Sequence, residues 1–145
     1  MPRILAACMM VTALALSAPA LADELGFVVV AHPDVAVDHL SPDALGRIFK
    51  KETTRWPDGT PIVPVEVGGT APTRSSFYRA TLKLVVGDVT AYWINQAMTT
   101  GNNPPKIFSS DGLVMRYVGQ TPGAVGFVSP DTPADPRVKR IAIGP

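Results

Sequence analysis

Residues 40–67, LSPDALGRIFKKETTRWPDGTPIVPVEV, carry the helix, turn and strand signals that decide the fold. A helix is predicted after Ser41, because a serine side chain can cap free backbone N–H groups and Pro42 suits the first helical position. A turn is predicted at residues 57–59, Pro-Asp-Gly, where proline presets the backbone and glycine relieves a crowded exit. Residues 62–67 are mostly apolar and β-branched, so they predict a strand.

The segment before this stretch extends the pattern. Residues 27–31, FVVVA, form a continuous apolar run, which is typical of a strand covered on both faces in an α/β sheet. Strand, helix and strand in this order predict a right-handed crossover between residues 27–31 and residues 62–67. Pro64 has no N–H to donate to a ladder, so we expect it at an edge position or a bulge.

Three more helices are predicted further along the chain. They cover residues from about 73 to 84, residues from about 88 to 98, and a segment that Ser110 caps and Gly119 ends in the left-handed conformation. Each helix has an apolar stripe that we expect to face the core. The stripes consist of Phe77, Ala80, Thr81 and Leu84, then Val89, Tyr92, Trp93 and Ala97, and finally Leu113, Val114, Tyr117 and Val118.

The C-terminal third closes the predicted sheet. Residues 121–124, Thr-Pro-Gly-Ala, have the pattern of a type II turn, and residues 125–128 and 138–143 predict two strands. Strands that alternate with helices indicate an α/β domain. We therefore expect a mixed sheet of about four to five strands flanked by helices.

The first 22 residues predict an export signal. Arg3 supplies a positive start, residues 4–16 are almost entirely apolar, and residues 20–22, Ala-Leu-Ala, form a cleavage site. A retained N-terminal anchor is the alternative, although the run is shorter than a membrane span needs. Removal of 22 residues from 145 leaves residues 23–145, which we expect to form one domain in the periplasm.

The composition of residues 23–145 excludes several classes of function. Cys8 is the only cysteine and leaves with the signal, so a disulfide or a thiolate metal site is excluded. Loss of Arg3 leaves 12 basic residues against 12 acidic ones, and this neutral balance gives no reason to expect nucleic acid as a partner. No catalytic motif is present, so we expect a protein that is not an enzyme and needs no cofactor.

The best candidate ligand site is the loop and helix start after the strand at residues 62–67. Glycines allow close approach of a ligand, and a helix N-terminus offers free N–H groups and a partial positive charge. The predicted ligand-binding residues are Gly69, Thr70, Thr73, Arg74, Ser75 and Ser76. Arg74 would supply charge to an oxyanion, and the hydroxyls would supply hydrogen bonds. The simpler alternative is a strand-to-helix loop in which a threonine caps the helix and Arg74 is solvated.

A second group of polar residues follows the first strand. His32, Asp34, Asp38 and His39 are ligand types that zinc or copper accepts. Their spacing is not that of a helical pair, and Pro33 indicates a turn. We therefore favour turn-forming aspartates and surface histidines over a metal site, with the possibility that the segment lines a ligand site without metal.

Four segments in order resemble one domain of the periplasmic phosphate-binding proteins. They are residues 40–67, then TRSSFYRATL, then YW, and then TPGAVGFVSP. The positions in step with that family are Leu40, Ser41, Leu45, Ile48, Phe49, Trp56, Asp58, Gly59, Arg74, Phe77, Pro122, Gly123, Ala124, Gly126 and Val128, with Val125 and Phe127 as conservative replacements.

The resemblance implies a single periplasmic-binding-protein-like lobe that binds a small oxyanion, with phosphate as the default, in ABC-type uptake. Members of the family close two lobes on the ligand, whereas this chain has the length of one. Its glycine loop also differs, since Ala71, Pro72 and Thr73 stand between Thr70 and Arg74. The alternative is a protein-interaction or sensing module that has lost solute binding. A membrane transporter or sensor subunit, or a second copy of the chain, would then be its partner.

Overall fold

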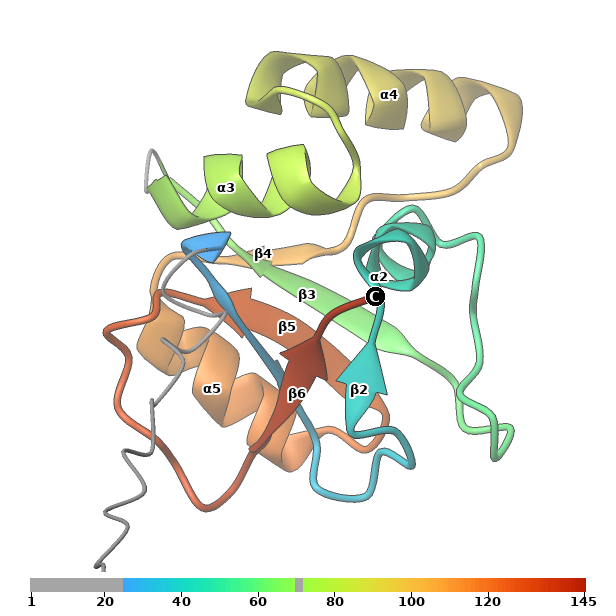
Figure 1. Ribbon diagram of the computed structural model, residues 1–145. Helices are drawn as coiled ribbons and strands as arrows, with labels where there is room; N and C mark the ends of the chain where they lie inside the picture. The colour runs from blue at the N-terminus through green and yellow to red at the C-terminus, as the bar shows by residue number, and fades with distance from the viewer. Residues whose placement is uncertain (1–24, 70–71) are drawn as a thin grey trace, which may run out of the picture.

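The computed structural model describes residues 25–69 and 72–145 as a mixed sheet flanked by helices (Figure 1). Six strands pair in the order β2-β6-β1-β5-β3-β4. The elements are β1 (Val28–Ala31), β2 (His39–Leu40), α2 (Pro42–Phe49), β3 (Val63–Val67), α3 (Pro72–Thr81), α4 (Val86–Thr99), β4 (Lys106–Phe108), α5 (Asp111–Gln120), β5 (Ala124–Val128) and β6 (Lys139–Ile143). The α/β class is confirmed, with two very short strands, β2 and β4, beyond those expected.

The predicted crossover between β1 and β3 is wrong. β1 runs antiparallel to both of its neighbours, β5 and β6, whereas β3 is parallel to β5. β1 and β3 are therefore antiparallel to each other and separated by β5. The short β2, which pairs with β6 in parallel, is the strand that directly precedes α2. Two residues are too few to show a periodic pattern, so this strand could not be recognised in the sequence.

The predicted start of α2 is confirmed. The Ser41 hydroxyl accepts a hydrogen bond from the backbone N–H of Ala44 at 3.1 Å, and Pro42 opens the helix. Pro64 lies in β3, an internal strand. Its pairing with β5 includes Pro64 opposite Val125, but its pairing with β4 begins only at Val65. One side of Pro64 thus faces no paired strand in the described ranges, which agrees with an edge-like position.

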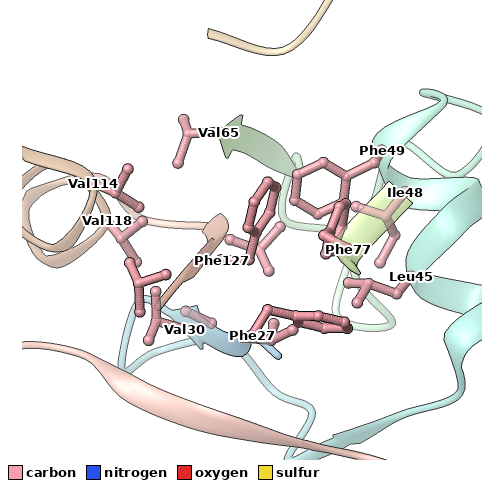
Figure 2. Close-up of a cluster of buried hydrophobic side chains, with 14 of the residues drawn as sticks. Phe27, Val30, Leu45, Ile48, Phe49, Val65, Phe77, Val114, Val118 and Phe127 are labelled. Carbon is pink, nitrogen blue, oxygen red and sulfur yellow. The ribbon is translucent and has the colours of Figure 1, made fainter. Parts of the chain in front are cut away.

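The core has two halves, one on each face of the sheet. Neighbouring residues of a strand point to opposite faces, and β5 shows this directly. The Phe127 ring stacks on Phe77 of α3 at a centroid distance of 3.9 Å, while a Cβ at Gly126 would lie 3.0 Å from Val114 of α5. Helices α2 and α3 therefore cover one face and α5 covers the other, and Figure 2 shows Phe49 beside Phe77 in the first half.

Helix α4 lies outside α3 and is less buried than its sequence predicts (Figure 1). Val89 and Trp93 are buried, Tyr92 is half-buried, and Ala97 is exposed. The prediction that four side chains of this helix face the core is therefore wrong for Ala97 and only partly met by Tyr92. Because α4 packs on α3 rather than on the sheet, only a narrow line of its side chains reaches the interior.

Helix α5 differs from its prediction in two details. Val114 and Val118 are buried, but Leu113 is 40% exposed. Gly119 does not end the helix in the left-handed conformation, because α5 continues to Gln120. Gly119 instead lies against Arg137, where an added Cβ would come within 3.1 Å of the Arg137 Cβ. The glycine is explained by close packing rather than by a helix stop.

The type II turn at residues 121–124 and the cap of α5 are confirmed. Gly123 has a φ of +79°, and the Ala124 N–H donates to the Thr121 carbonyl at 3.1 Å. The Ser110 hydroxyl accepts from the Leu113 N–H. Across residues 25–69 and 72–145, every helix is too short or too polar to cross a membrane. The predicted export signal, residues 1–22, lies outside the described residues.

Candidate functional site

A cavity of about 340 Å³ opens between α3, α4 and the strands β3 and β4. Its polar end consists of Glu66, Arg74 and Tyr78. The rest of its wall comes mainly from α4, from the loop after it and from β4, and is mostly apolar: Val89, Thr90, Trp93, Ile94, Ala97, Pro104 and Ile107. Many ligand sites combine an apolar wall with a few convergent polar groups, so this cavity is the best candidate site of the molecule.

The polar end is a connected network of three side chains. The Tyr78 hydroxyl donates a hydrogen bond to Glu66 Oε2. Arg74 Nε in turn donates to the Tyr78 hydroxyl at 3.0 Å, and Arg74 Nη2 lies 3.6 Å from Glu66 Oε2. Two of these contacts reach the same carboxylate oxygen, Glu66 Oε2, and the one hydrogen bond that Arg74 donates within the network comes from Nε. Glu66 Oε1 and Arg74 Nη1 are the polar atoms of the network that a ligand could use.

Burial determines the electrostatics of this network. Glu66 is only 3% exposed, and desolvation raises the pKa of its carboxyl, while Tyr78 and Arg74 partly offset that rise. Burial, with the nearby Glu66 carboxylate as a second cause, also raises the pKa of the Tyr78 hydroxyl well above its ordinary value. When Glu66 is ionised, its charge balances that of Arg74. When Glu66 is protonated, the polar end carries the positive charge of Arg74 alone.

Of the five predicted ligand-binding residues that the structure describes, one lies at the cavity. Arg74 lines it, whereas Thr73 is buried and Ser75 and Ser76 are half-buried on α3. Gly69 is exposed with a φ of +88°, in the left-handed region that favours glycine. Thr70 lies outside the described residues. The role of these residues toward a ligand stays a prediction.

The histidine and aspartate group after β1 is held by other contacts. His32 Nδ1 accepts a hydrogen bond from the Asp34 N–H at 3.1 Å, which closes a tight turn. Asp38 pairs with Lys139 of β6 at 2.8 Å, and His39 belongs to β2. Within residues 25–69 and 72–145, no three His, Cys, Asp or Glu side chains gather closely enough to hold a metal ion.

Sequence reasoning missed Glu66 and Tyr78. Arg74 and Tyr78 stand four residues apart in one helix, a spacing that places side chains on the same face. That signal was available. The contribution of Glu66 was harder to find, because a glutamate in an apolar strand reads as solvent-facing unless its partner on another element is known. The contact depends on α3 packing over β3.

The fold of the chain is similar to that of part of several solved phosphate ABC transporter substrate-binding proteins. A substrate-binding protein of this kind from Clostridium perfringens, solved with bound phosphate, is 19% identical, with a TM-score of 0.60 over 81% of this chain. An ABC-type phosphate transport receptor from Vibrio cholerae is 21% identical, with a TM-score of 0.59 over 81%. PstS from Borrelia burgdorferi is 13% identical, with a TM-score of 0.60 over 83%. No protein-family model and no curated protein matches the sequence.

The chain spans about half the length of these solved structures, namely 44%, 46% and 52% of the three chains. At this level of identity the likeness is one of fold. The resemblance that the sequence motifs indicated is thereby confirmed for the architecture.

Proposed function

We propose that this chain is a periplasmic solute-binding module that takes a small oxyanion, with phosphate as the first choice, as part of ABC-type uptake. The observation that carries the proposal is the Arg74 guanidinium at the polar end of a cavity. A guanidinium fork suits an oxyanion, and α3 has no acidic residue in its first turn to oppose one. Two of the structural neighbours are named for phosphate and ABC transport, which supports the choice of ligand and pathway.

Binding rather than catalysis is proposed, because the polar end has one carboxylate, one tyrosine and one arginine and no activated nucleophile. We expect weak affinity for residues 23–145 by themselves, since a single lobe leaves much of a small ligand exposed. A transporter subunit or a second copy of the chain could supply the opposite wall, and either partner stays a prediction.

The test is calorimetric titration of residues 23–145 with phosphate and with sulfate in a buffer free of both. Saturable binding is expected, and Arg74→Ala should weaken it roughly ten- to a hundredfold, since a charge-assisted contact is lost. Arg79→Ala is the matched control, because Arg79 is exposed on the same helix and outside the cavity. Equal affinity in the Arg74 variant would remove this residue as the anchor.

Glu66 gives the test a second arm. Its ionised carboxylate offsets the charge of Arg74, so Glu66→Gln should bind sulfate more tightly than the wild type. Sulfate keeps its charge across the useful pH range, so in the wild type its affinity should rise as pH falls through the raised pKa of Glu66. If neither the wild type nor Glu66→Gln gives a measurable binding signal at millimolar anion, oxyanion binding is contradicted.

A second candidate function is contact with a membrane transporter or sensor subunit. The observation that favours it is the exposed apolar surface of α4 and its start, where Val85, Ile94 and Met98 are 65%, 58% and 83% exposed. Co-purification with a defined transporter subunit should be lost in the double variant Ile94→Ser and Met98→Ser. Leu113→Ser on α5, where the leucine is 40% exposed, is the control and should leave co-purification intact.

A further inference from the structure

The wall of the cavity is a poor match for a bare inorganic ion. Among the described residues, the lining side chains with polar atoms are Glu66, Arg74, Tyr78, Thr90 and Trp93, whose indole has one N–H, and the other lining side chains are apolar. A phosphate ion held by Arg74 would occupy one end and leave most of the 340 Å³ unfilled. Apolar surface next to a hydrated ion gives no binding energy and displaces water that solvates the charge. The polar end alone would serve such an ion.

Two apolar side chains at the cavity remain open to solvent. Ile94 of α4 is 58% exposed and Ile107 of β4 is 48% exposed, and both line the cavity. Trp93, in the same wall, is only 7% exposed. A ligand with an apolar body would cover Ile94 and Ile107 and stack near the indole, which removes apolar area from water.

We propose that the cavity binds an organic acid, a molecule with one oxyanionic head group and an apolar body about the size of an aromatic ring. The head group would meet the free part of the Arg74 fork, and the body would lie against Trp93, Ile94 and Ile107. This inference rests on the proposed function in taking Arg74 as the anchor, and it deepens that function by naming the class of solute.

The charge of the polar end favours an acid over an amine. Glu66 Oε2 already receives the Tyr78 hydroxyl and lies 3.6 Å from Arg74 Nη2, so the carboxylate has a cation of its own. Arg74 is a permanent charge, whereas the Glu66 carboxyl can lose its charge by protonation. A neutral apolar molecule would leave the Arg74 fork unused.

The experiment compares four probes by calorimetry on residues 23–145. Phosphate and methylphosphonate carry the head group with little or no body, phenylphosphonate carries both, and benzyl alcohol carries the body without the charge. Phenylphosphonate is expected to bind roughly tenfold or more tightly than methylphosphonate, because the ring removes apolar area from water. Benzyl alcohol binding as tightly as phenylphosphonate would overturn the proposal.

A matched pair of variants locates the apolar body. Ala97→Phe places a ring into the cavity and should make phenylphosphonate bind no more tightly than methylphosphonate. Ala91→Phe is the control, because Ala91 is also exposed on α4 but does not line the cavity. If both variants still bind phenylphosphonate more tightly than methylphosphonate by the same factor as the wild type, the apolar body of the ligand lies elsewhere and the proposal is wrong.

The outcomes separate this inference from the proposed function. Arg74-dependent binding of phenylphosphonate without measurable binding of phosphate or sulfate would support the inference and contradict a bare oxyanion as the ligand. Equal affinities for phosphate, methylphosphonate and phenylphosphonate would support the proposed function and overturn the inference. An Arg74→Ala variant that binds phenylphosphonate as well as the wild type would overturn both.

Discussion

The Tyr78 hydroxyl donates a hydrogen bond to the Glu66 carboxylate and thereby joins α3 to β3 inside the protein. Tyr78 is fully buried and Glu66 is 3% exposed, so their contact is largely shielded from bulk water. A buried carboxylate is costly unless it is paired and hydrogen-bonded. The contact therefore stabilises the position of α3, and it partly offsets the rise in the pKa of Glu66 that burial causes.

Removal of the Tyr78 hydroxyl should destabilise the protein. Tyr78→Phe takes a donor from Glu66 and an acceptor from Arg74 Nε, and we expect it to lower the free energy of unfolding by about 1–3 kcal/mol. Urea denaturation measures this change. Tyr92→Phe is the control, because the Tyr92 hydroxyl has no hydrogen bond within the described ranges, and its effect should stay within about 0.5 kcal/mol. Equal effects in the two variants would show that the buried contact contributes nothing.

Glu66 should make stability fall as pH rises. Burial raises its pKa above the ordinary 4.5, so the folded protein keeps a proton that the unfolded chain releases. This contribution to stability is fully present below 4.5 and is lost as pH rises through the raised pKa. Glu66→Gln does not titrate, so its free energy of unfolding relative to the wild type should increase with pH, by at most about 1.4 kcal/mol per pH unit.

Urea unfolding of both proteins between about pH 4 and pH 8 measures this linkage. The comparison cancels the titration of all other groups that the two proteins share. A difference that stays constant over the whole range would mean that Glu66 has the same pKa in the folded and unfolded states.

The Asp135 carboxyl should titrate far below its ordinary range. Arg137 Nη2 donates a hydrogen bond to this carboxyl at 2.7 Å, and the Arg137 backbone N–H donates a second one at 2.9 Å. Together these hydrogen bonds lower the pKa of Asp135 to about 2. Its contribution to stability is present above the ordinary value of 3.8 and is lost as pH falls through about 2. In Arg137→Gln the pKa should move back toward 3.8, as carboxyl chemical shifts in an NMR titration would report. If the pKa of Asp135 is the same in Arg137→Gln as in the wild type, Arg137 is not the cause of its low value.

Gly126 should not tolerate a side chain. An added Cβ would lie 2.9 Å from Val65 Cγ2 and 3.0 Å from Val114 Cγ1, between β3 and α5. Gly126→Ala is therefore expected to cost about 1–3 kcal/mol in thermal or urea unfolding. Gly87→Ala in the first turn of α4 is the control, because nothing lies within 4 Å of the place that its Cβ would take, and it should be neutral or stabilising. Tolerance at Gly126 would mean that β3 and α5 can move apart.

Local chemistry allowed several elements to be predicted from the sequence. Ser41 and Ser110 cap helices as expected, and Gly123 takes the left-handed conformation that its turn requires. These features depend on residues within four positions of one another, so the sequence contains the whole cause. The continuous apolar run at β1 likewise predicted a strand that is buried on both faces.

Long-range pairing decided what the sequence left open. The insertion of β5 between β1 and β3 depends on contacts between residues far apart in the chain, such as Val28 with Val128. Arg74 was recognisable as a charged candidate, but its partner Glu66 was not, because the two meet only once α3 lies over β3. The cavity has the same origin. Its apolar wall forms where α4 packs on α3 instead of on the sheet, and no local pattern contains that information.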